Sequence, residues 1–231
     1  MYRGILLDFY GTLVHEDDEI IPVICETIRR HACLPISPSD IGHLWWSSFS
    51  ALFTRSYGAD FLSQREAARR SLVETLDHVG ADLDPGALLQ RQFDHWIAPP
   101  IFPDTKPFLD DLAQSDIPVC IVSNIDRADL ELAIAFHGLR FEHIITSDDV
   151  RSYKPRPEIF EAALDRLGLA PHEVLHVGDS RTSDVAGAQA MGIPVAWVNR
   201  SGKPGTEQNP PAYEVQNLTE LSAIIQAYAS R

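Results

Sequence analysis

Residues 4–13 read Gly-Ile-Leu-Leu-Asp-Phe-Tyr-Gly-Thr-Leu, and this stretch decides the fold. Its apolar run ends in an acid followed by a loop, as a buried parallel strand does at its carboxyl end. Similar strand-like runs recur at 118–122, 143–146, 174–177 and 193–198, and helical patterns occupy 107–115, 128–136, 157–167 and 183–191. This alternation predicts an α/β fold, a parallel sheet with helices on both faces. A short helix over 219–229 is expected to end the chain, after a polar surface loop at 201–211.

Residues 20–96 break this alternation. Apolar side chains such as Ile21, Ile24 and Ile28 recur there at helical spacing, which predicts three or four helices. The sequence Ser37-Pro38-Ser39-Asp40 is a suitable amino-terminal cap for one of them. We therefore predict two domains: a discontinuous catalytic core of residues 1–15 and 98–231, and a helical cap of residues 16–97 inserted after the first strand.

The composition is that of an ordinary globular protein, with 45% hydrophobic and 23% charged residues in a chain of 231. Nineteen basic residues against 33 acidic ones give a net charge of −14. This charge disfavours nucleic acids and anionic membranes as partners. A site for an anionic substrate would need a local cation to reverse the sign of the field, and a divalent metal ion is the natural candidate.

The cysteine pattern and the absence of a long apolar segment predict a cytoplasmic protein. Three cysteines, Cys25, Cys33 and Cys120, stand among apolar residues without a Cys-x-x-Cys spacing, so we expect buried thiols in a reducing compartment. No window reaches the 18 or so apolar residues that a membrane span needs. We expect a small-molecule substrate, and a homodimer is compatible with the sequence.

Four short motifs fall at the carboxyl ends of predicted parallel strands, the edge at which open α/β sheets place their sites. They are Asp8–Leu13, Val122–Asn124, Lys154–Pro157 and Gly178–Asp184. Together, and in this order, they resemble the four motifs of the haloacid dehalogenase superfamily over nearly the whole chain outside the inserted helices. The resemblance implies a hydrolase with a Rossmann-like core and a cap domain.

The resemblance also implies a catalytic role for several polar side chains. A carboxylate at the end of a buried strand is a nucleophile when something neutralises the charge of the group it attacks, and Asp8 holds that position. Ser123, Asn124 and Lys154 would bind an anionic group of the substrate, together with loop amides such as that of Gly11. Thr12 completes the catalytic set in the first motif.

A Mg²⁺ site is implied at the same edge. Asp179 and Asp184 are hard oxygen ligands, five residues apart on a loop that opens a helix, and Asp8 would complete the cluster. Without a cation, three clustered carboxylates would raise one another's pKa values. In the family, a fourth contact comes from the backbone carbonyl at the position of Tyr10.

Tyr10 departs from the commonest family pattern. Phosphatases of the superfamily carry a second aspartate there as general acid and base, a role usually worth roughly 10²–10⁴-fold in rate. A tyrosine, with a pKa of about 10, is a poor base at neutral pH. An Asp-x-Tyr-Gly-Thr motif looks like the 2-haloacid dehalogenase branch, in which a halide leaves without a proton.

Other residues point away from that branch. Dehalogenases lack the Gly-Asp-x-x-x-x-Asp motif that this chain has at Gly178–Asp184, and carry Ser-Ser-Asn with a single aspartate instead. They also have a tyrosine at the place of Phe160, and their substrate-binding cap arginine aligns near Trp46. Arg29 and Arg55 are the alternatives to that arginine. We therefore favour a Mg²⁺-dependent phosphatase that acts on a small phosphorylated metabolite through an aspartyl-phosphate on Asp8.

Two alternatives remain open. One is a metal-independent 2-haloacid dehalogenase that works through an ester on Asp8, and the other is a catalytically weak phosphate-binding relic. In the inserted helices, Trp45, Trp46, Phe49 and Phe53 are interpreted as core rather than as a substrate pocket. His15 and Glu16 stand close enough to the first motif to reach a substrate, although an exposed histidine is the commoner case.

Overall fold

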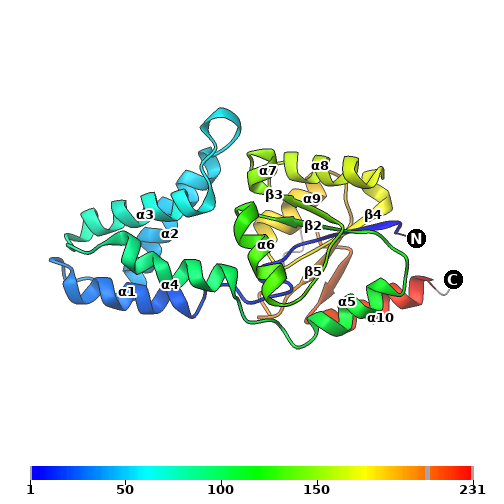
Figure 1. Ribbon diagram of the computed structural model, residues 1–231, viewed down its shortest axis with the longest axis horizontal. Coiled ribbons are helices and arrows are strands. Elements are labelled where there is room, and N and C mark those ends of the chain that lie inside the picture. The colour runs from blue at the N-terminus through cyan, green and yellow to red at the C-terminus, as the bar shows by residue number, and fades with distance from the viewer. Residues whose placement is uncertain (1, 206–208, 230–231) are drawn as a thin grey trace.

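The computed structural model describes residues 2–205 and 209–229 and contains, within these ranges, one parallel sheet of six strands (Figure 1). The strand order is β3-β2-β1-β4-β5-β6. The order reverses between β1 and β4, and open α/β sheets bind ligands at such a switch point. The strands are β1 Gly4–Leu7, β2 Val119–Ser123, β3 His143–Thr146, β4 Val174–Gly178, β5 Val195–Val198 and β6 Tyr213–Val215.

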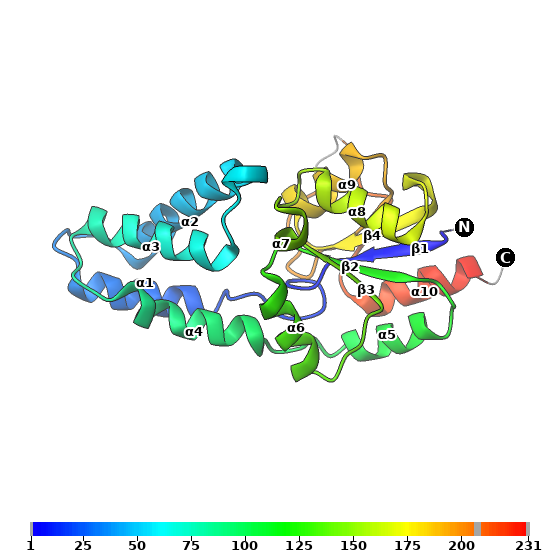
Figure 2. The same cartoon turned by 45° about the horizontal axis from the view of Figure 1, so that its top comes forward.

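Each central strand contributes to two hydrophobic cores because alternate side chains point to opposite faces of a sheet. In β1, Ile5 and Leu7 pack on one face, whereas Leu6 packs on the other. The first face is covered by α5, α6 and α10, and the second by α8 and α9 (Figures 1 and 2). These helices and the short α7 are α5 Thr105–Ala113, α6 Arg127–Phe136, α7 Ser147–Val150, α8 Glu158–Leu167, α9 Ala186–Ala190 and α10 Leu218–Ala229. The predicted α/β, Rossmann-like fold is confirmed.

Four α-helices form a separate lobe between β1 and α5, in a stretch of chain that is described throughout (Figure 2). They are α1 Ile20–His31, α2 Pro38–Arg55, α3 Gln64–Val79 and α4 Pro85–Ile97. Local sequence sets their ends: the Ser37 side chain accepts from the Asp40 amide at the start of α2, and Gly80 ends α3 in the left-handed conformation. We call this segment the helical lobe.

The helical lobe is joined to the sheet by polar contacts near the start of α3. Both oxygens of Asp126 accept backbone amides at the amino terminus of α3, from Gln64 at 2.6 Å and Arg65 at 3.1 Å. Arg65 also forms a bidentate ion pair with the buried Asp129, with both bonds 2.7 Å long. These contacts hold the lobe over the carboxyl edge of the sheet. Nothing in them tests the predicted domain boundaries, which stay a prediction.

The structure differs from the sequence predictions in detail. The segment 183–191 begins as one wide turn, Arg181–Val185, and only its second half is α9. The edge strand β6 was not predicted, because three residues are too few to show a periodic pattern. Cys33 is exposed rather than buried, and among the described residues none of the three cysteines is in a disulfide. Part of the predicted loop 201–211 lies outside the described residues.

Candidate active site

The predicted catalytic residues meet at the switch point of the sheet. Asp8 directly follows β1, and Asp179 directly follows the neighbouring strand β4. A cavity of about 720 Å³ opens there between the sheet edge and the helical lobe, and Asp8, Ser123, Lys154 and Asp184 are among its lining residues. Asp8 is 5% exposed, so its carboxylate lies at the bottom of this cavity.

Lys154 is the buried cation of the site. Its ammonium group donates to Oδ1 of Asp8 at 2.7 Å, to Oδ1 of Asp184 at 2.7 Å and to the carbonyl of Val122 at 2.9 Å. Its three protons therefore have three acceptors. Asn124 holds the lysine backbone, since its amide donates to the Lys154 carbonyl at 3.0 Å and accepts from the Lys154 amide at 2.7 Å. Asn124 thus positions Lys154 with its side chain.

Asp184 is held by a second buried donor that the sequence analysis did not single out. Nε2 of His176 lies 2.9 Å from the Asp184 oxygen that also accepts from Lys154. His176 is fully buried on β4, with its ring edge-on to that of Phe160. Burial lowers the pKa of His176, so the ring is neutral and Nε2 carries the proton toward Asp184. A polar residue inside the apolar run 174–177 was the available signal.

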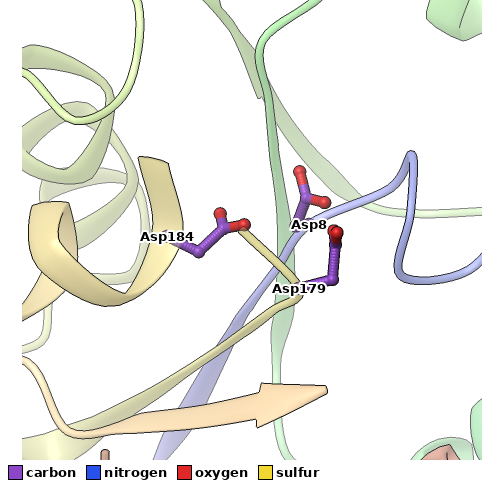
Figure 3. Close-up of side chains that lie close together, drawn as sticks. All are labelled: Asp8, Asp179 and Asp184. Atoms are coloured by element: carbon purple, nitrogen blue, oxygen red, sulfur yellow. The ribbon is translucent and has the colours of Figure 1, made fainter. Parts of the chain in front are cut away.

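Three carboxylates form the cluster that was expected to bind a metal ion (Figure 3). Oxygen atoms of Asp8, Asp179 and Asp184 all lie within 4.8 Å of one another. The hydroxyl of Thr12 lies 3.2 Å from Asp8 and 3.3 Å from Asp179, and its single proton serves one of them at a time. Gly11 has a φ of +80°, and a Cβ there would collide with the Asp179 carboxylate. This glycine allows the loop to approach Asp179, while its amide donates to the Val14 carbonyl.

The carboxylates differ in their ionisation. Burial raises the pKa of Asp8 to about 6, although Lys154 opposes the shift. Burial and the neighbouring Asp8 hold the pKa of Asp179 well above its ordinary value. Burial also acts on Asp184, but Lys154 and His176 outweigh it and keep the pKa of Asp184 below its usual range. The cluster therefore has the electrostatics of a cation site: a positive ion would stabilise the ionised forms of Asp8 and Asp179.

The Tyr10 hydroxyl is not available for acid-base chemistry at the carboxylate cluster. Its hydroxyl donates to the backbone carbonyl of Trp96 in the helical lobe, at 2.5 Å. Burial, together with the nearby Asp129, raises the pKa of Tyr10 far above its ordinary value. The phenol of Tyr10 therefore keeps its proton, and this proton is hydrogen-bonded to the Trp96 carbonyl in the helical lobe.

All four aromatic residues of α2 line the cavity, and their interpretation as core is right for the buried Trp45 and for Phe49, which packs against the core, but wrong for Trp46. Only Trp45 is buried, with its indole N–H donating to Ser71. Trp46 is 67% exposed, and Phe49 and Phe53 lie half-buried beside it along the cavity wall. The prediction failed for Trp46 because helical spacing does not distinguish a face turned to a neighbouring helix from one turned to a pocket.

The remaining candidates divide between the cavity and the surface. Glu16 lines the cavity, whereas His15 stacks on Phe102, with ring centroids 3.9 Å apart. Arg29 pairs with Glu26 on the outside of α1, and Arg55 is exposed at the end of α2. Neither arginine is among the residues that line the cavity.

The site thus combines a parallel α/β core, a carboxylate at its switch point, a buried lysine beside that carboxylate and a helical lobe above them. Comparison with known proteins assigns the family. A model of the haloacid dehalogenase-like hydrolases matches residues 2–192, and the chain belongs to this family.

The relatives of known activity span nearly the whole chain. An (S)-2-haloacid dehalogenase 4A of Burkholderia cepacia is 34% identical over 231 residues, which is 96% of this chain and 94% of that protein. An (S)-2-haloacid dehalogenase of Pseudomonas sp. strain YL is 28% identical, with 99% and 97% covered.

Solved structures confirm the fold without choosing between activities. The L-2-haloacid dehalogenase of Xanthobacter autotrophicus has a TM-score of 0.76 at 23% identity, covering 98% of this chain and 99% of that one. A HAD phosphatase of Thermococcus onnurineus has a TM-score of 0.66 at 28% identity, with 97% and 98% covered. The same fold thus carries both chemistries.

The preference for a phosphatase was wrong. The relatives that match nearly the whole chain are haloacid dehalogenases. The residue that distinguishes dehalogenases from phosphatases in this family, Tyr10 here, agrees with these relatives. The Tyr10 hydroxyl is bound to Trp96, so this position supplies no acid for an alkoxide leaving group. The two aspartates of the Gly178–Asp184 motif weighed too heavily in the prediction, because Asp184 also pairs with Lys154, a role that needs no metal ion.

Proposed function

We propose that the protein is a 2-haloacid dehalogenase that works through an ester on Asp8. The observation that carries this proposal is the bond from the Tyr10 hydroxyl to the Trp96 carbonyl. A halide is a stable anion and leaves without a proton, so the reaction does not need the acid that Tyr10 fails to provide. The names of the full-length relatives support the same reaction.

Asp8 offers one oxygen for the attack. Lys154 holds Oδ1 at 2.7 Å, whereas the contact of Oδ2 with the Thr12 hydroxyl is longer, at 3.2 Å. Oδ2 attacks the carbon that bears the halogen, the carbon–oxygen bond forms, and the halide leaves with the electron pair of the broken bond. One displacement at carbon inverts its configuration, and the Lys154 ammonium fixes the carboxylate in line for it.

Water then attacks the carbonyl carbon of the Asp8 ester and releases a 2-hydroxy acid, with one water oxygen left on Asp8. The proton of the water needs an acceptor close to Asp8. Asp179 is the carboxylate placed for it, since its oxygen lies within the 4.8 Å cluster and its raised pKa makes it a stronger base than an ordinary carboxylate.

The substrate carboxylate needs donors in the same cavity. We assign this role to the hydroxyl of Ser123, which lines the cavity, with Lys154 as the nearest buried positive charge. Arg181 and Lys203 also line it and reduce the negative potential of its acids. Asn124 acts here by positioning Lys154.

We also propose that Mg²⁺ binds the three-carboxylate cluster. Asp8, Asp179 and Asp184 are hard oxygen ligands of the kind that Mg²⁺ prefers, and the Tyr10 carbonyl is the expected fourth ligand. The raised pKa values of Asp8 and Asp179 supply the physical reason for a cation here. When bound, the ion neutralises the carboxylates. Departure of halide does not require it.

The test of the main proposal is release of halide from (S)-2-chloropropionate in EDTA. We expect turnover by the wild type and none by Asp8→Asn, which keeps the shape of the side chain and removes its charge. Asp110→Asn, an exposed aspartate on α5, is the matched control and should behave as wild type. Absence of halide release by folded wild-type protein would refute the proposal.

Three broader assignments remain proposals. The helical lobe, residues 16–97, acts as the cap of a core formed by residues 1–15 and 98–231. The protein works in the cytoplasm, and a homodimer is compatible with its sequence. Among the described residues, no helix is both long enough and apolar enough to cross a bilayer.

A further inference from the structure

The lobe side of the cavity is built from three aromatic rings in a row. Trp46, Phe49 and Phe53 stand three and four residues apart on α2, so they share one face of the helix. The ring centroids of Trp46 and Phe49 are 6.0 Å apart, and those of Phe49 and Phe53 are 4.8 Å apart. We call these three residues the aromatic ladder.

The Trp46 end of the ladder is largely exposed, although its ring packs against that of Phe49. Trp46 leaves 67% of its surface exposed while it lines the cavity. Contiguous exposed apolar patches, rather than single exposed rings, mark binding surfaces. Ile21 and Pro22 of α1 line the same cavity, so apolar groups from two helices face it.

The cavity is larger than a short haloacid needs. Its volume of about 720 Å³ lies within the range of roughly 300–1,000 Å³ found for sites of drug-sized ligands. 2-Chloropropionate at Asp8 would leave the ladder in contact with water. A substrate that also covers the ladder gains the free energy of burying apolar surface.

The charges at the mouth restrict what can lie there. Glu16, Asp17 and Asp18 line the cavity together, and Asp17 is fixed by bonds from Gln92 at 2.6 Å and Trp96 at 3.1 Å. A second negative group on the substrate would meet these carboxylates and be repelled. The group that reaches the ladder is therefore not an anion.

We propose that the preferred substrate is a 2-halo acid with an arylalkyl substituent, whose ring lies against Trp46 and Phe49 while its carboxylate and halogen lie at Asp8. This inference rests on the proposed dehalogenation for its reacting end. The aromatic ladder is the evidence for the aryl group of the substrate, because stacked and edge-on contacts between aromatic rings add to the free energy gained by burial.

The experiment compares kcat/KM for 2-chloro-3-phenylpropionate and 2-chloropropionate. We expect the wild type to favour the phenyl substrate at least tenfold. Trp46→Ala should lower this ratio about tenfold, mainly through KM, and Trp46→Phe should restore part of it. Phe136→Ala is the matched control: Phe136 is 64% exposed on α6, outside the cavity, and its loss should leave both substrates unchanged. A ratio near one in the wild type would overturn the inference.

A binding measurement separates this inference from the proposed reaction. Titration calorimetry on Asp8→Asn compares 3-phenylpropionate with propionate, and neither compound has a leaving group. Tighter binding of 3-phenylpropionate that Trp46→Ala abolishes supports the aryl site, even if no haloacid is turned over. Halide release from 2-chloropropionate without any preference for 3-phenylpropionate would leave the dehalogenase proposal standing and refute the aryl site. Failure of both measurements would refute both.

Discussion

Nε2 of His176 lies 2.9 Å from Oδ1 of Asp184, in a part of the core that is closed to solvent. The same oxygen accepts from Lys154, which in turn holds Asp8. Lys154 thus orients Asp8, the proposed nucleophile, and is itself held by Asp184. His176 in turn fixes Asp184 as a second hydrogen-bond donor. The chain of contacts runs from β4 through the α8–α9 side of the sheet to its catalytic edge.

His176→Phe should reduce kcat for halide release about tenfold with little change in KM. The ring shape is kept, but Asp184 loses a donor and Lys154 can shift relative to Asp8, and small misplacements of reacting groups are costly in rate. His176→Gln, which can still donate to Asp184, should recover part of the loss. Steady-state kinetics on variants with matched unfolding midpoints would check this. Equal activity of the phenylalanine and glutamine variants would contradict a positioning role.

Lys154→Met should abolish halide release and destabilise the protein by about 3–5 kcal/mol, the usual consequence of leaving a buried charge without its partner. Asp8 and Asp184 would both lose the ammonium group that now lies 2.7 Å from each. Urea unfolding at pH 7 measures the loss. Because protonated carboxylates need no counter-charge, the difference from wild type should shrink at pH 4. A constant difference across this range would argue against the ion pair as its cause.

The parallel sheet and the meeting of the four motifs were predictable, because both follow from alternating apolar runs that end in polar residues. Asp8 lies more than a hundred residues before Lys154, Asp179 and Asp184 in the chain, yet parallel strands bring their carboxyl ends to one edge. The branch of the family was not predictable in the same way. The decisive fact is where the Tyr10 hydroxyl points, and that depends on the Trp96 carbonyl, 86 residues further along the chain.

The face that α2 turns to the cavity was equally invisible in the sequence. Trp45 and Trp46 are neighbours in the chain, but one is 4% exposed and the other 67%. Helical periodicity places them on different sides of α2 without saying which side meets α3. His176 was overlooked for the opposite reason: a histidine in a buried strand was visible, but its partner Asp184 is brought to it only by the turn after β4.

The pH dependence of kcat/KM should report the ionisation of Asp8. Burial raises its pKa from the ordinary value of 3.8 to about 6, and only the ionised carboxylate attacks carbon. In EDTA, kcat/KM should therefore rise about tenfold per pH unit below pH 6 and level off above it. Halide release from (S)-2-chloropropionate between pH 4.5 and 8 gives the profile. A plateau that already begins at pH 4.5 would show that Asp8 is ionised throughout this range.

Mg²⁺ should raise the unfolding temperature at pH 8 and have little effect at pH 4.5. The folded-state pKa of Asp8 is raised, so this group weakens the fold as the pH rises from about 4 to about 6, where the unfolded chain has already released the proton. A cation bound to the ionised cluster reverses this loss, by about 2.7 kcal/mol at a hundred times its dissociation constant. Asp179→Asn should remove the shift, as measured by calorimetry with Mg²⁺ or EDTA. Equal unfolding temperatures with and without Mg²⁺ at pH 8 would refute the cation site.

Tyr10→Phe removes a single oxygen atom and tests whether the reaction uses the Tyr10 hydroxyl, as the general acid of a phosphatase would require. The change removes the hydroxyl that donates to the Trp96 carbonyl and keeps the ring, so we expect a loss of about 1 kcal/mol in stability, typical of one hydrogen bond. Halide release should stay within about threefold of wild type, because no step of the proposed reaction uses the phenol proton. A general acid at this position would instead cost roughly 10²–10⁴-fold. Parallel urea unfolding and halide assays decide between these outcomes: a large loss of rate in a stably folded variant would mean that Tyr10 takes part in the chemistry.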